Sequence, residues 1–312
     1  MKPDILIAVP IYAATMAALD RQFTTHRLFQ AADRAAFLNG VRDKVRAIVT
    51  SGGAGADAAL INALPKAEII ACFGVGIDAI DLGAARARNM AVSNTPDVLT
   101  EDVADLALGL ILDSQRRISR GDRFVRAGNW LKGGLELGSA LNGRKLGIVG
   151  LGRIGRATAQ RAAAFGMRIA YHGPREKPDV PYPFFADLVA LARDSDILCL
   201  TLPGGTGTRH LVNAAVLEAL GSRGTLVNVA RGSIVDEAAL VAALQSGALG
   251  AAALDVFADE PRVPPALLAM ENVVLQPHVG SATEETRDAM GQLVIDNLTA
   301  HFAGLPLPTR VV

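Results

Sequence analysis

The sequence has few cysteines, no excess of charge of either sign and no long apolar run, and each shortage excludes a class of protein. Its two cysteines, Cys72 and Cys199, lie in apolar segments and predict buried, reduced thiols rather than disulfides or metal ligands. The 31 basic residues balance 31 acidic ones, so no basic surface indicates nucleic acid or membrane binding. The largely apolar stretch 103–112 is about half the length that a membrane-spanning helix needs. We therefore expect a cytoplasmic protein without metal, membrane or nucleic-acid partners.

The N-terminal apolar run, residues 5–14, loosely imitates a signal peptide because Lys2 precedes it. However, Pro10 interrupts this run, and residues 5–9 have the composition of a buried strand. We therefore predict the first strand of a sheet here.

The abundant residue types point to an α/β protein. Half of the 312 residues are hydrophobic, and alanine, glycine, valine and leucine dominate, as in folds with buried parallel strands. Short apolar runs alternate with helical stretches throughout. The expected strands are 5–9, 47–50, 69–72 and 91–93 in the first part, and 146–149, 168–171, 197–201, 225–229, 251–256 and 273–275 in the second. The helix expected over 284–303 should pack on the first part, which we predict to be a separate parallel-sheet unit.

A glycine motif organises the second part. Gly150, Gly152 and Gly155 have the spacing G-x-G-x-x-G between an expected strand and an alanine-rich helical stretch. The first glycine allows the tight turn, the second lets a pyrophosphate approach the backbone, and the third lets helix and strand pack closely. The helix N-terminus then offers free N–H groups to the phosphates. The motif predicts a doubly wound dinucleotide-binding domain.

The end of the second expected strand bears on which dinucleotide binds. NAD sites usually place an acidic residue there, for the ribose 2′-hydroxyl. This chain instead continues from Tyr171 through His172 to Arg175, whose guanidinium suits a 2′-phosphate. We therefore expect NADPH or NADP, with NADH possible. The alternative is that Arg175 is a solvated loop residue.

Three ionisable residues follow expected strands, where parallel sheets bind ligands. Reduction of a 2-oxo acid needs a cation for the carboxylate and carbonyl, an acid for the forming alkoxide, and a partner that keeps this acid charged. Arg231, His278 and Glu260 supply these roles in that order, because a carboxylate bonded to imidazole favours imidazolium. Taken singly, Arg231 is as easily a surface ion-pair residue, His278 a packed loop residue and Glu260 a turn residue.

At these residues the sequence resembles the D-isomer-specific 2-hydroxyacid dehydrogenases, and within them the NADPH-preferring hydroxypyruvate/glyoxylate reductases. The matching stretches are 73–78, 94–100, 150–155, 228–237, 255–261 and 277–283. The resemblance implies two Rossmann-like doubly wound parallel-sheet domains, with the nucleotide domain inserted into the substrate domain. It divides the chain into a substrate domain of residues 1–97 plus 284–312 and an NADP-binding domain of residues 98–283.

The resemblance also implies roles for particular residues. Arg231, Glu260 and His278 would be catalytic. Substrate contacts would come from Gly53, Val75, Gly76, Arg231 and Trp130. Cofactor contacts would come from Gly150, Gly152, Arg153, Ile154, Gly155, Arg175, Pro203, Thr208, Val229, Ala230, Asp255, His278 and Gly280. Members of the family are typically homodimers, and Trp130 would reach the partner's active site. The glycine-rich stretch 204–207 departs from the family pattern beside Thr208.

Two other functions remain open on the sequence. One is a nucleotide-sensing, corepressor-like binding protein on the same scaffold. The other is a dehydrogenase of a larger 2-oxo acid, such as 2-ketogluconate or phosphoglycerate. The presence of Arg231, Glu260 and His278 favours an enzyme, and the size of the pocket between residues 52–55, Val75 and Trp130 would decide the substrate.

Overall fold

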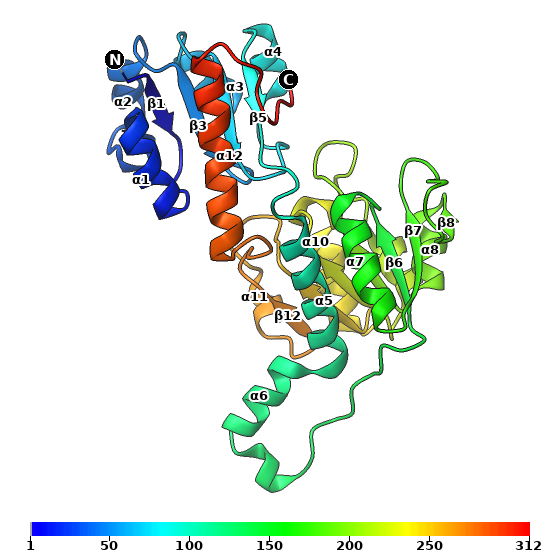
Figure 1. The fold of residues 1–312 in the computed structure, drawn as a ribbon. Coiled ribbons are helices and arrows are strands. Elements are labelled where there is room, and N and C mark those ends of the chain that lie inside the picture. Colours follow the sequence, from blue (N-terminus) through cyan, green and yellow to red (C-terminus); the bar gives the residue numbers. More distant parts are fainter. Residues whose placement is uncertain (1) are drawn as a thin grey trace. The chain divides into compact units, whose positions relative to one another are not determined.

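The computed structural model describes residues 2–312, which form two α/β units (Figure 1). Unit 1 comprises Met1–Leu99 with Ser281–Val312, and unit 2 comprises Thr100–Gly280. The chain thus passes into unit 2 once and returns once. Among the helices that the structure describes, none combines the length and the hydropathy of a membrane span.

Unit 1 is built on a five-stranded parallel sheet of order β2-β1-β3-β4-β5. Its strands are β1 (Asp4–Ile7), β2 (Thr24–Arg27), β3 (Ala47–Ser51), β4 (Ile69–Phe73) and β5 (Ala91–Ser93). Its helices are α1 (Ala13–Gln22), α2 (Arg34–Val41), α3 (Ala58–Ala63), α4 (Leu82–Ala87) and α12 (Glu284–Phe302), with the 3-10 turn η1 (Leu28–Gln30). As expected, α12 packs against this unit, on β4 and α1 (Figure 1).

The core of unit 1 follows from the strand composition. Ile48 and Ile70, on the central strands β3 and β4, are fully buried. Cys72 is buried beside them as predicted. The edge strand β2 was not predicted, because its sequence Thr-Thr-His-Arg is polar.

Unit 2 is built on a seven-stranded parallel sheet of order β12-β11-β10-β9-β6-β7-β8. Its strands are β6 (Lys145–Val149), β7 (Arg168–His172), β8 (Phe184–Phe185), β9 (Ile197–Leu200), β10 (Thr225–Asn228), β11 (Ala251–Leu254) and β12 (Val273–Leu275). Its helices are α5 (Thr100–Arg116), α6 (Ile118–Arg126), α7 (Arg153–Ala164), α8 (Leu188–Asp194), α9 (Ala214–Leu220), α10 (Glu237–Ser246) and α11 (Pro265–Leu268), with the 3-10 turns η2 (Asn129–Lys132) and η3 (Gly232–Ile234).

Three features of unit 2 refine the sequence expectations. Helix α5 buries one apolar face, including Ala104 and Ile111, and packs against α7 and the strands β10 to β12. Burial raises the pKa of Cys199 to about 12, so this thiol stays protonated and inert. The parallel order reverses direction at β6 and β9, and such a switch point is where doubly wound sheets bind ligands.

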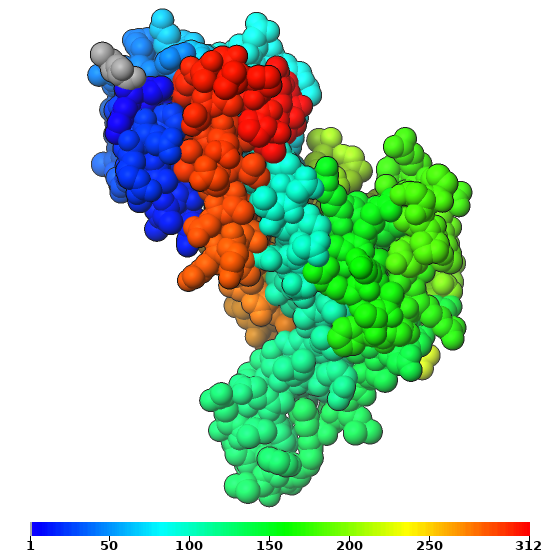
Figure 2. Space-filling view, viewed as in Figure 1, coloured from blue at the N-terminus to red at the C-terminus, as the bar shows by residue number. Residues whose placement is uncertain are grey.

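An arm of residues 118–140 extends from the body of unit 2 (Figure 2). The arm includes α6 and η2 and carries five exposed apolar side chains. These are Ile118, Val125, Trp130, Leu131 and Leu137. Trp130 is 70% exposed and Leu131 is 95% exposed, which is unusual for large apolar side chains clustered on one segment.

Candidate functional site

The glycine turn between β6 and α7 has the geometry that a pyrophosphate requires. Gly150 has φ +95°, and a Cβ there would stand 2.6 Å from Leu202 Cβ. A Cβ on Gly155 would stand 2.4 Å from the carbonyl oxygen of Gly150, which confirms the close helix–strand packing. Gly152, by contrast, faces open space and leaves the start of α7 without a side-chain cap. The residues therefore fit a dinucleotide phosphate at this helix N-terminus.

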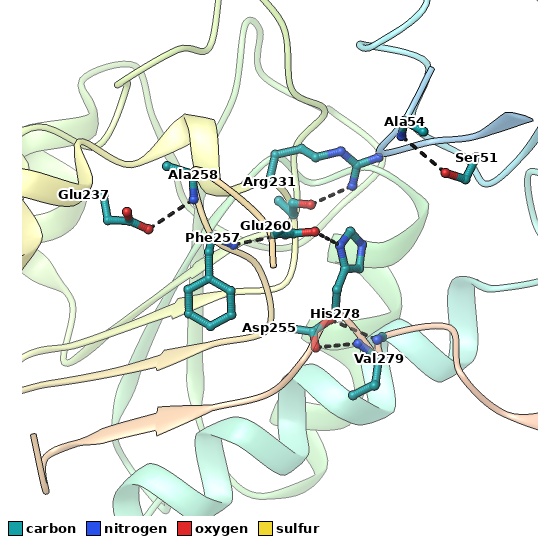
Figure 3. Close-up of polar contacts among 12 residues, drawn as sticks. Ser51, Ala54, Arg231, Glu237, Asp255, Phe257, Ala258, Glu260, His278 and Val279 are labelled. Carbon is teal, nitrogen blue, oxygen red and sulfur yellow. Dashed lines mark hydrogen bonds and ion pairs between the residues drawn. The ribbon is translucent and has the colours of Figure 1, made fainter. Parts of the chain in front are cut away.

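The catalytic candidates come together because their strands are neighbours. Arg231 follows β10, Glu260 follows β11 and His278 follows β12, and these strands are adjacent and parallel. Their carboxyl ends therefore lie along one edge of the sheet (Figure 3). This edge belongs entirely to unit 2.

His278 and Glu260 form the central pair of the site. The His278 Nδ1 atom lies 2.7 Å from Glu260 Oε2, and the other Glu260 oxygen accepts a hydrogen bond of 3.0 Å from the Phe257 N–H. Burial pushes the pKa of Glu260 upward. The hydrogen bond and charge of His278 outweigh that effect, so this pKa lies below its ordinary value. Glu260 is thus an ionised partner suited to an imidazolium.

Asp255 fixes the turn that carries His278. Its carboxylate accepts hydrogen bonds from the Val279 N–H at 2.7 Å and the Gly280 N–H at 2.9 Å. Its backbone oxygen accepts a third from the His278 N–H at 2.9 Å. His278 is left-handed, with φ +54°, a conformation that a non-glycine residue adopts only under such constraint. Burial raises the pKa of Asp255 against the effect of these hydrogen bonds.

The backbone around Arg231 is also held on both sides. The Asn228 side chain accepts from the Ala230 N–H at 3.0 Å and donates to the Arg231 carbonyl at 3.0 Å. The Arg231 guanidinium donates to the Ala230 carbonyl at 2.7 Å. A Cβ on Gly232 would lie 1.9 Å from the Phe257 carbonyl carbon, so the two loops touch through backbone alone.

The loop of Glu260 has a second acidic anchor. Glu237, in the first turn of α10, accepts a hydrogen bond of 3.1 Å from the Ala258 N–H (Figure 3). The N–H groups of Phe257 and Ala258 are therefore bound by two different carboxylates. Sequence reasoning missed Glu237 and Asn228. A signal was present, since both lie in the stretch 228–237, which resembles the family.

The remaining cofactor candidates lie at different positions in unit 2. Val229 and Ala230 are buried directly after β10. Arg153 and Ile154 begin α7. The Thr208 hydroxyl donates to the Pro203 carbonyl at 2.9 Å, so it closes its own glycine-rich loop.

Arg175 lies in an exposed loop after β7. The loop is fixed beyond it, because the Tyr171 hydroxyl accepts a hydrogen bond of 2.6 Å from the Lys177 N–H and Asp179 pairs with Arg156 at 2.8 Å. Within the described chain, the Arg175 guanidinium has no hydrogen bond or ion pair. Its charge is therefore available to a ligand.

The substrate candidates other than Arg231 lie elsewhere. Gly53, Val75 and Gly76 belong to loops after β3 and β4 in unit 1, and Trp130 lies on η2 of the arm. Among the residues that the structure describes, no group of three or more acidic, histidine or cysteine side chains is placed to hold a metal.

Known proteins resemble this chain in both sequence and fold. Residues 108–280 match the NAD-binding domain of the D-isomer specific 2-hydroxyacid dehydrogenases. Over 308 residues the chain is 48% identical to glyoxylate/hydroxypyruvate reductase A of Arabidopsis thaliana, covering 99% of this chain and 98% of the relative. The chain belongs to this dehydrogenase family. It is therefore an oxidoreductase with a nicotinamide-dinucleotide-binding domain, as the glycine motif and strand-end residues predicted.

Two further family members bear on substrate and cofactor. The 2-ketogluconate reductase of Gluconobacter oxydans is 43% identical and matches 100% of this chain and 99% of its own length. The crystal structure of an NADPH-dependent glyoxylate/hydroxypyruvate reductase from Sinorhizobium meliloti, in complex with NADP and malonate, superposes with a TM-score of 0.94 at 44% identity, covering 100% and 97% of the two chains. The two-unit α/β fold is thus the fold of this family, as predicted.

Proposed function

We propose that the chain reduces a small 2-oxo acid, glyoxylate or hydroxypyruvate, to the D-2-hydroxy acid with NADPH. The observation that carries this proposal is the His278–Glu260 pair at the ligand-binding edge of a dinucleotide-binding sheet. Because Glu260 occupies Nδ1, the ring is oriented, and Nε2 makes no hydrogen bond within the described chain. That nitrogen can therefore deliver a proton. Relatives named glyoxylate/hydroxypyruvate reductase, one of them NADPH-dependent, support the same reaction.

The protein groups divide the work in this proposal. The nicotinamide, when bound, supplies a hydride to the carbonyl carbon. Arg231 stabilises the negative charge that develops on the carbonyl oxygen. His278 gives its proton to that oxygen, and Glu260 stabilises the protonated ring before transfer. Unit 2 would bind the dinucleotide, and unit 1 would bind the substrate through residues 52–55 and 73–76.

Initial rates test the reaction directly. Glyoxylate, hydroxypyruvate and 2-ketogluconate would each be supplied with NADPH and with NADH, and nicotinamide absorbance followed. Turnover of the two small acids supports the proposal. A preference for 2-ketogluconate would make the chain a dehydrogenase of larger acids, the function of one relative. Nucleotide binding without turnover of any 2-oxo acid would favour a nucleotide-sensing protein instead.

Arg175→Ala should separate the two cofactors. If this guanidinium binds the 2′-phosphate, its loss removes charge-assisted hydrogen bonds, and KM for NADPH should rise about 10–100-fold. KM for NADH, which lacks the phosphate, should change less than twofold. The exposed Arg193 on α8 offers a matched Arg193→Ala control. Equal effects of Arg175→Ala on the KM for both cofactors would show that Arg175 does not bind the 2′-phosphate.

Glu260→Gln should change the pH profile as well as the rate. The glutamine amide carries no negative charge to stabilise the protonated ring of His278, so kcat should fall, and the acid limb that Glu260 gives to the wild-type profile should disappear. In the wild type the pKa of Glu260 is lowered by folding. The stabilisation that the ionised Glu260 contributes is therefore fully present above the unfolded carboxyl pKa of about 4.3 and is lost as pH falls through the lower folded value. An acid limb of kcat that persists unchanged in Glu260→Gln would contradict the pairing.

We also propose that the arm of residues 118–140 joins two copies of the chain as a homodimer. Its five apolar side chains, Trp130 and Leu131 among them, are exposed in the single chain, and such a patch typically marks a protein interface. Sedimentation equilibrium should give twice the chain mass for the wild type. The double variant Trp130→Ser, Leu131→Ser should shift the measured mass toward that of the monomer. An unchanged mass would exclude the arm as the dimer interface.

A further inference from the structure

Glu237 connects helix α10 to the loop that carries Glu260. It lies in the first turn of α10, and its carboxylate accepts a hydrogen bond of 3.1 Å from the Ala258 N–H, 21 residues further along the chain. An acidic residue in a first turn commonly stabilises the helix itself. Here Asp236 already caps α10, because its carboxylate accepts from the Ala239 N–H at 3.0 Å. The Glu237 carboxylate instead binds a separate segment of unit 2.

The peptide group between Phe257 and Ala258 is restrained from several sides. Its N–H donates to Glu237, and its carbonyl carbon packs so closely on Gly232 that a Cβ there would stand 1.9 Å away. The Phe257 side chain, which is 7% exposed, is fixed in the core of unit 2. The N–H of Phe257 itself donates to Glu260 at 3.0 Å. Restraints on this peptide group therefore reach the Glu260 carboxylate through one residue.

The hydrogen bond from Ala258 to Glu237 lies on an exposed part of the loop. If the Glu237 carboxylate were removed, water would bind the Ala258 N–H, so no buried donor would be left unsatisfied. We therefore expect this contact to contribute little to the stability of the fold. Its effect is to limit the movement of a loop whose Glu260 carboxylate lies 2.7 Å from His278 Nδ1.

We propose that Glu237 is a positioning residue for the proton transfer. Through the Ala258 N–H it fixes the loop of Glu260, and Glu260 in turn orients the His278 ring. Catalytic geometry depends on such support, since a displacement of about 1 Å can lower a rate about 10²-fold. This inference rests on the proposed function, because it assigns Glu237 a role in the same reaction.

Two variants of Glu237 and one control test this role. Glu237→Ala should lower kcat for glyoxylate and hydroxypyruvate about 10–100-fold, with the KM for both acids and for NADPH within about threefold of wild type. Glu237→Gln keeps an acceptor oxygen and should retain kcat within about threefold. Glu218→Ala removes the same side chain from an exposed position of the adjacent helix α9 and should leave kcat unchanged. A loss that glutamine does not rescue, accompanied by a lower Tm, would make Glu237 structural and overturn the proposal.

A double-mutant cycle shows whether Glu237 acts through Glu260. In the Glu260→Gln background, Glu237→Ala should lower kcat by less than about threefold, because the ion pair that Glu237 positions is already lost. If Glu237→Ala instead lowered kcat by its full factor in that background, Glu237 would act independently of Glu260, and the proposal would be wrong.

Histidine NMR tests the same role without turnover. The Nδ1 chemical shift of His278 reports its hydrogen bond to Glu260, and it would be measured through the carbon-bound ring protons of ¹⁵N-histidine-labelled protein and assigned with His278→Asn. Glu237→Ala should move this chemical shift toward its value in Glu260→Gln, and Glu237→Gln should leave it unchanged. If the wild type reduces no 2-oxo acid, the proposed function fails, and this measurement still decides the positioning role. A chemical shift in Glu237→Ala equal to that of the wild type overturns it.

Discussion

His278→Asn should lower kcat for glyoxylate and hydroxypyruvate by about 10²–10⁴-fold, the usual contribution of a general acid. Asparagine tolerates the left-handed backbone that His278 adopts at φ +54°. It also leaves the hydrogen bonds of the Asp255 carboxylate to Val279 and Gly280 intact, because these use backbone N–H groups. The loss should therefore come from proton transfer and not from a displaced turn. Steady-state rates across a pH range would measure it.

Cofactor affinity is the control for this variant. Because the acid acts in the transition state, the loss of activity should appear in kcat, and the Kd for NADPH should stay within about threefold of wild type. A variant that retained turnover within a few-fold of wild type would exclude His278 as the proton donor.

Gly232→Ala should be the most damaging single-methyl change in unit 2. The added Cβ would lie 1.9 Å from the Phe257 carbonyl carbon and 2.4 Å from the Ala258 nitrogen. These backbone atoms have little freedom to withdraw, because the N–H groups of Phe257 and Ala258 donate to Glu260 and Glu237. We expect a loss of about 1–3 kcal/mol in the free energy of unfolding, as for an overpacked core.

Activity should fall with stability in Gly232→Ala, because the clash separates the loop of Arg231 from the loop of Glu260. Gly109→Ala is a suitable comparison, since Gly109 is exposed within α5 and has nothing within 4 Å of its added Cβ. That change should stabilise the protein by up to about 1 kcal/mol. Urea unfolding and kcat would be measured for both. A Gly232→Ala protein as stable and active as wild type would show that the two loops adjust independently.

The sequence predicted the buried strands well and the edges of the sheets poorly. Every strand that carries an apolar run was expected near its true position, because a strand covered on both faces must be apolar. The missed strands, Thr24–Arg27 and Phe184–Phe185, lie at sheet edges, and one is polar and the other only two residues long. Helix boundaries were also not predicted: α3 begins at Ala58 because the Asp57 carboxylate caps it by accepting a hydrogen bond of 2.8 Å from the Leu60 N–H.

The sequence likewise predicted those features of the site that follow from strand order. It did not predict those that depend on contacts in the folded chain. Arg231, Glu260 and His278 could be brought together from the sequence, since each comes after a strand of one parallel sheet. The left-handed turn at His278 was hidden, because it depends on hydrogen bonds from the Val279 and Gly280 N–H groups to the Asp255 carboxylate.

The confinement of Arg231, Glu260 and His278 to unit 2 has an evolutionary consequence. Under the proposed function, the segment that delivers a proton to the carbonyl lies in a different unit from the loops that select the acid. Mutations in unit 1 can then change the substrate range of the enzyme while its chemistry is conserved. Relatives of similar length named for glyoxylate, hydroxyphenylpyruvate and 2-ketogluconate are the expected products of such divergence.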